Sequence, residues 1–160
     1  MRRVLDLYYR LLQIALTVLM GVLIVPVTMQ ILSRFSAAVP RYIWTEEVAR
    51  FCFVWIIMIG AMIAVRDGTH FDVDVLPRSR NPKVEAALRL LLRLAMLAVA
   101  GIFVWYGWRF VLFGWNQTSE IAELPMVWMF AAFPLAGVSW LLFVGEKMVE
   151  DLRLWREGRP

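Results

Sequence analysis

Hydrophobic residues gather into four long runs along the chain, and most polar residues lie between them. The runs cover residues 11–32, 46–65, 88–113 and 125–144. As an α-helix, each run is long enough to cross a hydrocarbon core about 30 Å thick. The pattern therefore predicts an all-α integral membrane protein with four transmembrane helices.

Prolines mark particular points of these predicted helices. Pro26 lies inside the first run and Pro134 lies midway along the fourth, so we expect a kink at each. Pro125 suits the first turn of the fourth helix, where a missing N–H is tolerated. Beyond this run, apolar residues recur at helical spacing over residues 146–157, which predicts a short amphipathic helix.

The connections between the runs differ in character. Residues 33–45 mix arginines with aromatic side chains, as is typical of a segment lying along the membrane surface. Residues 66–87 are the longest polar stretch, whereas residues 114–124 carry no positive charge. Lys and Arg are concentrated near both termini and in 66–87, and such residues accumulate on the cytoplasmic side. We therefore expect both termini in the cytoplasm and the acidic pairs 46/47 and 120/123 on the outer face.

The composition agrees with a single membrane domain over residues 1–160. Hydrophobic residues make up 61% of the chain and charged residues only 19%, and the mean hydropathy is +0.67. The first run is too long for the apolar region of a signal peptide, so we interpret it as a retained helix. The net charge of +4 follows the expected topology, and no nucleic-acid partner is expected.

The second run opens with charged residues, in the stretch WTEEVAR. Thr45 can cap a helix, which places Glu46 and Glu47 in the first turn, where the helix dipole favours negative charge. Arg50 follows one turn later, within reach of both carboxylates. A capped, self-neutralised helix start is the structural interpretation. A contact with a partner, or a proton or ion site in the membrane, are the functional ones.

Arg109 interrupts the third run near its outer end. Its long side chain can reach the outer headgroups, or it can pair with Glu46 or Glu47 if the third helix lies close to the second.

Groups that carry chemistry in membranes are sparse in this sequence. The runs contain no strip of ionisable residues through the bilayer centre, no histidine pair for haem and no Glu-x-x-His motif for a di-iron site. His70, Asp72 and Asp74 are a weak metal signal, and the lone Cys52 allows no internal disulfide. We expect no catalytic, substrate-binding or metal-binding residue and no cofactor, which indicates an accessory subunit.

The block RYIWTEEVARFCFVWIIMIGAMIAVRDGTHFDVDVLP resembles the signature of a known family, the small membrane subunit of TRAP (tripartite ATP-independent periplasmic, DctQ-like) transporters. The matching positions are Trp44, Glu46, Glu47, Arg50, Phe53, Trp55, Gly60, Ala61, Arg66, His70 and Asp74. A later block, LPMVWMFAAFPLAG, resembles the family's last span at Leu124, Pro125, Trp128, Pro134 and Gly137. The resemblance covers about residues 10–145.

The resemblance implies a division of labour among three proteins in the bacterial inner membrane and periplasm. A large membrane subunit would hold the substrate and sodium sites and move by an elevator-type motion. The small subunit would pack beside it as a fixed scaffold. A periplasmic binding protein would deliver the substrate, usually an organic acid, to the outer face of both, and the system would use an ion gradient instead of ATP.

Two sets of interface residues follow from this resemblance together with the predicted topology. The residues expected to fasten the second helix to its own chain or to the large subunit are Trp44, Glu46, Glu47, Arg50, Trp55, Gly60, Arg66, His70 and Asp74. The residues expected on the outer face, for docking of the binding protein, are Arg34, Arg41, Glu120 and Glu123.

Two other function classes compete with a transporter subunit. One is a structural or assembly protein of the membrane with no role in transport. The other is a small membrane enzyme, which the lack of deep polar clusters disfavours. A large permease and a secreted binding protein encoded beside this chain would distinguish the transporter subunit from both.

Overall fold

The computed structural model describes residues 2–35, 40, 42–67, 82–120 and 123–156. Its helices are α1 (Arg2–Phe35), α2 (Trp44–Asp67), α3 (Pro82–Gly114), α4 (Val127–Phe130) and α5 (Ala132–Arg156). Within the described residues, four helical stretches are long and apolar enough to cross a membrane, at Arg3–Phe35, Trp44–Asp67, Leu91–Gly114 and Val127–Met148. The predicted all-α architecture with four such helices is confirmed.

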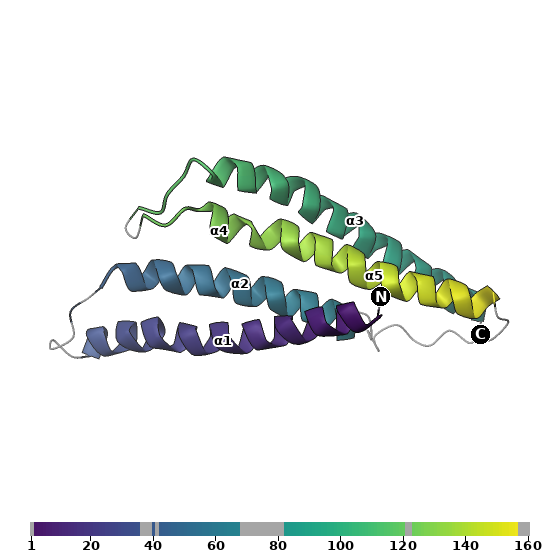
Figure 1. The fold of residues 1–160 in the computed structure, drawn as a ribbon, viewed down its shortest axis with the longest axis horizontal. Helices are drawn as coiled ribbons and strands as arrows, with labels where there is room; N and C mark the ends of the chain where they lie inside the picture. The colour runs from purple at the N-terminus through teal and green to yellow at the C-terminus, as the bar shows by residue number, and fades with distance from the viewer. Residues whose placement is uncertain (1, 36–39, 41, 68–81, 121–122, 157–160) are drawn as a thin grey trace.

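The helices lie side by side in the order α1, α2, α4 with α5, and α3 (Figure 1). The end of α1 and the start of α2, like the end of α3 and the start of α4, lie at one end of the molecule, which we call the turn end (Figure 1). The start of α1 and the end of α5 lie toward the other end, which we call the terminal end (Figure 1). α2 and α5 thus have helical neighbours on two sides, whereas α1 and α3 form the flanks.

The first connection is shorter than the sequence suggested. α1 continues through Phe35 and α2 begins at Trp44, so both ends of the expected surface segment 33–45 are helical. Ser33, Arg34 and Phe35 extend α1 beyond its apolar run, and no proline interrupts the chain between Leu32 and Pro40. Of the residues between these helices, the structure describes Pro40, Tyr42 and Ile43. The third helix likewise begins earlier than expected, at Pro82, a residue suited to the first helical position.

The fourth span is interrupted between α4 and α5, one turn before Pro134, the proline at which the sequence predicts a kink. α4 ends at Phe130, Ala131 keeps helical backbone angles (φ −61°, ψ −22°), and α5 begins at Ala132. Pro134 has no N–H to donate to the carbonyl of Phe130, so the regular helical bonding breaks one turn before the proline. Pro26, by contrast, lies inside α1 without ending it.

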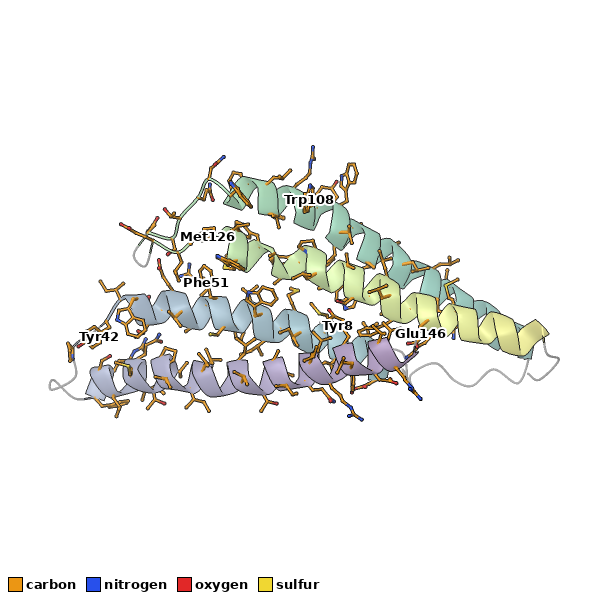
Figure 2. All side chains as sticks on the ribbon, in the orientation of Figure 1. Tyr8, Tyr42, Phe51, Trp108, Met126 and Glu146 are labelled. Atoms are coloured by element: carbon orange, nitrogen blue, oxygen red, sulfur yellow. The ribbon has the colours of Figure 1, made fainter. Side chains whose placement is uncertain are left out.

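The core is built where α1, α2 and α5 meet. Its buried members are Leu5, Leu12, Ile59, Met62, Val65, Ala136, Phe143 and Val144. Many other large apolar side chains, especially on α1 and α3, are exposed and project outward from the two flanks (Figure 2). In a membrane protein, lipid or the helices of a partner cover such side chains.

Candidate functional site

A cleft of about 650 Å³ lies at the turn end, between the start of α2 and the segment that leads into α4. Figure 2 shows Phe51 of α2 and Met126 on opposite sides of it. Four of the residues singled out from the sequence line this turn-end cleft, namely Glu46, Glu47, Arg50 and Glu120. The structure therefore brings together members of both predicted interface sets.

The far wall of the turn-end cleft is a short hairpin-like segment. The Ser119 N–H donates to the Leu124 carbonyl at 2.9 Å, and the Met126 N–H donates to the Gln117 carbonyl at 2.9 Å. Inside the turn that the Ser119–Leu124 bond closes, Glu123 adopts a positive φ of 52°, a left-handed conformation that is uncommon outside glycine. The backbone thus presents Ser119 to α2, and the predicted docking residue Glu123 is part of the turn that makes this possible.

Glu47 joins α2 to this segment. Its side chain is buried, with 8% of its surface exposed, and its Oε2 accepts a hydrogen bond of 2.5 Å from the Ser119 hydroxyl. A buried carboxylate is stable only when hydrogen bonds or charges replace its lost hydration. Glu47 therefore contacts another segment of its own chain, through a residue that the sequence did not single out.

The expected sharing of Arg50 between two carboxylates is not observed. Within the described part of the chain, the structure records no ion pair of Arg50 with Glu46 or Glu47. Glu47 turns toward Ser119, and Arg50 and Glu46 are exposed. Exposed charges gain little from pairing, because water or lipid headgroups solvate them.

Two further possibilities near the turn end are not observed among the described residues. Thr45 lies inside α2, and its hydroxyl donates to the Tyr42 carbonyl at 2.7 Å instead of capping a backbone N–H. No pairing of Arg109 with Glu46 or Glu47 is recorded among residues 42–67 and 82–120. The order of the helices explains this, because α4 and α5 separate α3 from α2 (Figure 1).

A second hollow, of about 350 Å³, lies between the end of α1 and the start of α2, and we call it the α1–α2 cavity. Arg34, predicted to face a binding protein, lines it together with Gln30 and Glu46. Trp44 is 43% exposed and packs near the Tyr42 ring, with centroids 6.2 Å apart. Arg41 lies outside the described residues.

At the terminal end, Arg66 connects three helices. From α2 it donates to the Leu5 carbonyl and to the Asp6 carboxylate of α1. Its guanidinium also lies 4.8 Å from the ring centroid of Tyr9 and 5.3 Å from that of Phe143 on α5. Arg66, like Glu47, thus binds α2 to its own chain.

Neighbouring polar contacts at the terminal end involve residues that sequence reasoning missed. The Tyr9 hydroxyl donates to Asp67 at 2.6 Å, and the hydroxyls of Tyr8 and Ser139 lie 2.6 Å apart. Lys147 of α5 donates to the Val65 carbonyl at 3.4 Å. The sequence feature that could have indicated these contacts is the clustering of hydroxyl and charged residues near the helix ends on this side.

Trp55 and Gly60 differ in what they contact. The indole N–H of Trp55 donates to the Trp128 carbonyl at 3.0 Å and so links α2 to α4. A Cβ added at Gly60 would meet no heavy atom within 4 Å, so this glycine serves no close packing among the described residues. Close approach occurs instead at Gly107 and Gly137, where α3 meets α5 and an added Cβ would come within 3 Å of backbone atoms. His70 and Asp74 lie outside the described residues.

Within residues 2–35, 42–67, 82–120 and 123–156, the structure contains no group of three or more His, Cys, Asp or Glu side chains placed to hold a metal ion. Cys52 is a buried free thiol on α2. The polar side chains of the described residues thus make contacts between helices and line two hollows at the turn end.

Comparison with known proteins adds a family to this geometry. The sequence matches the family model of the tripartite ATP-independent periplasmic transporters, DctQ component, over residues 23–154. It is similar to the sialic acid TRAP transporter small permease protein SiaQ of Vibrio cholerae, with 27% identity over 138 residues, 85% of this chain and 78% of that protein. It is also similar to the C4-dicarboxylate TRAP transporter small permease protein DctQ of Rhodobacter capsulatus, with 36% identity over 98 residues, 59% of this chain and 43% of that protein.

A longer protein shares the similarity. The sialic acid TRAP transporter permease protein SiaT of Haemophilus influenzae is 28% identical over 109 residues, 68% of this chain but 18% of that protein. Across these relatives and a further small permease protein of Haemophilus influenzae, the chain spans between 18% and 78% of the relative's length. Each of these proteins is named as a component of a transporter and not as an enzyme.

Proposed function

The chain belongs to the family of DctQ components of tripartite ATP-independent periplasmic transporters, and we propose that it acts as the small membrane subunit that packs beside a large permease subunit as a fixed scaffold. The observation that carries the proposal is the family match over residues 23–154, which includes the last three spans and the end of the first. The similarity to a short part of the longer permease protein SiaT supports a close association with a large subunit.

The transported substrate in this proposal is an organic acid. It would be delivered by a periplasmic binding protein, and a sodium gradient would drive its uptake through the large subunit. The names of two relatives, a sialic acid and a C4-dicarboxylate transporter component, support this chemical class. The small subunit itself would bind neither the substrate nor sodium.

We place the chain in the bacterial inner membrane with both termini in the cytoplasm. The turn end would then face the periplasm, where Arg34, Glu120 and Glu123 could contact a binding protein. The distribution of Lys and Arg supports this orientation. A reporter enzyme that works only in the cytoplasm should be active when it is fused after Pro160. Activity of a reporter that works only in the periplasm, fused at the same point, would overturn the orientation.

The proposed function is tested by co-purification and uptake. The chain, tagged and expressed with the large permease encoded beside it, should carry that permease through purification in mild detergent. Proteoliposomes of the pair should take up the acid bound by the cognate binding protein only with an inward sodium gradient. A chain that purifies alone and is dispensable for uptake would favour a structural or assembly protein instead.

A further inference from the structure

The α1–α2 cavity is lined by groups of opposite charge on opposite helices. Arg34 lies in the last turn of α1, and Glu46 lies in the first turn of α2. We propose that this cavity binds the headgroup of a membrane lipid that carries a phosphate next to a primary ammonium, that is, a phosphoethanolamine headgroup. The inference concerns this chain alone and does not rest on the proposed function.

The α1 side of the cavity offers hydrogen-bond donors. Gln30 is one of the residues that line the cavity. Its side-chain Nε2 is buried and has no hydrogen-bond partner in the described structure. Buried amide donors are nearly always satisfied, so one left over next to a hollow indicates a missing acceptor. One turn away, the guanidinium of Arg34 supplies several donors in a geometry that suits phosphate oxygens.

The acceptors come mainly from α2, with one hydroxyl, that of Ser33, on α1. The Thr45 hydroxyl gives its hydrogen to the Tyr42 carbonyl at 2.7 Å, and the Ser33 hydroxyl, across the cavity, gives its hydrogen to the Gln30 carbonyl at 2.9 Å. Both oxygens are therefore left with lone pairs only. Together with the Glu46 carboxylate they can accept from an ammonium group, which has three N–H donors and no lone pair.

This pairing of donors and acceptors discriminates between lipid headgroups. Phosphocholine has no N–H to donate to Glu46, and phosphoglycerol has no positive charge to balance it. Phosphoethanolamine satisfies both sides, because its phosphate meets Gln30 and Arg34 while its ammonium meets Glu46. A lipid is favoured over a soluble ligand because the apolar side chain of Ile43 lines the cavity and is 60% exposed. The cavity also lies at the ends of two helices that are long and apolar enough to cross a membrane, where lipid headgroups would be found.

The test measures lipid retention by the full chain, alone or with its partner subunit, in detergent. Defined amounts of phosphatidylethanolamine, phosphatidylcholine and phosphatidylglycerol with identical acyl chains are added, and bound lipid is counted by native mass spectrometry. We expect phosphatidylethanolamine to bind about tenfold more tightly than the other two, the value of one hydrogen bond to a charged group. Equal retention of the three lipids, or a preference for phosphatidylglycerol, would overturn the proposal without any variant being needed.

Variants assign the effect to the cavity. Arg34→Gln should weaken phosphatidylethanolamine binding about tenfold, and Glu46→Gln should abolish the preference over phosphatidylcholine. Arg109→Gln is the matched control, since Arg109 is an exposed arginine toward the same end but outside the cavity. An equal loss in this control would refute the site. Soluble phosphoethanolamine that binds as tightly as the lipid would overturn the choice of a lipid as the ligand.

Discussion

Arg66 should stabilise the terminal end of the molecule much more than its ion pair with Asp6 alone would. The Arg66 side chain is only 17% exposed, whereas that of Asp6 is 59% exposed, so the pair itself is largely screened. The remaining contacts are a hydrogen bond to the Leu5 carbonyl and two aromatic rings, those of Tyr9 and Phe143. These tie α2 to both α1 and α5.

The magnitude follows from these contacts. A hydrogen bond from a charged donor contributes about 1.5–3 kcal/mol, a partly exposed cation–π contact about 0.5–1 kcal/mol, and an exposed ion pair less than about 1 kcal/mol. Arg66→Ala should therefore lower the free energy of unfolding by about 3 kcal/mol. Asp6→Asn should lower it by less than about 1 kcal/mol.

The chain contains its own probe for this measurement. Cys52 is the single cysteine and is buried, so a thiol-reactive fluorophore reports thermal unfolding of the detergent-solubilised protein. For Arg66→Ala the midpoint should fall by about 6–12 °C. Arg10→Ala, which removes an exposed arginine from the same end of α1, serves as the control and should change the free energy of unfolding by less than about 0.5 kcal/mol. If the two variants unfolded at the same temperature, Arg66 would not fasten the helices.

Three further predictions use the same assay. Ser119→Ala leaves the buried carboxylate of Glu47 without this donor and should cost about 1–3 kcal/mol, and an unchanged midpoint would remove the link from α2 to the hairpin-like segment. Gly137→Ala forces a Cβ to within 2.8 Å of α3 and should cost about 1–3 kcal/mol. The matched change Gly101→Ala meets open space and should stabilise by about 0.5–1 kcal/mol, so equal effects at the two glycines would contradict the packing. Trp55→Phe keeps an aromatic side chain but loses the indole N–H that bonds to α4 and should cost about 1 kcal/mol, whereas a neutral result would show that this bond does not stabilise the fold.

The positions of the helices could be predicted from sequence because one effect dominates them. About 20 apolar residues in a row gain more from burial in a bilayer than any local preference can oppose. The ends of the helices were less certain, since interfacial residues such as those around Phe35 and Pro82 suit either a helix or a loop. The break before Pro134 has a local cause, but its place depends on which carbonyl loses its partner.

Contacts between helices could not be predicted in the same way. Glu47 reaches Ser119 and Tyr8 reaches Ser139 only because of how the helices are ordered and tilted, and neither partner has a distinctive sequence context. Local reasoning favoured Arg50 as the partner of Glu47, since it lies within one helical turn. A short hydrogen bond to a buried carboxylate outweighs a solvated ion pair, so the distant residue is preferred.

The residues of the second helix that resemble the family signature divide into two groups once their contacts are known. Glu47, Trp55 and Arg66 bind other helices of their own chain. Glu46 and Arg50 are exposed, and Gly60 has open space where a Cβ would be. A side chain already engaged inside the fold is restrained by stability, but an exposed charge at a membrane boundary or a glycine facing no neighbour gains nothing from its own chain. The second group is therefore where a contact with a partner subunit or a lipid is to be sought. Changes of Glu46 or Arg50 should impair assembly while leaving the unfolding temperature unchanged, whereas Gly60→Ala should impair assembly and, like Gly101→Ala, stabilise the helix by about 0.5–1 kcal/mol.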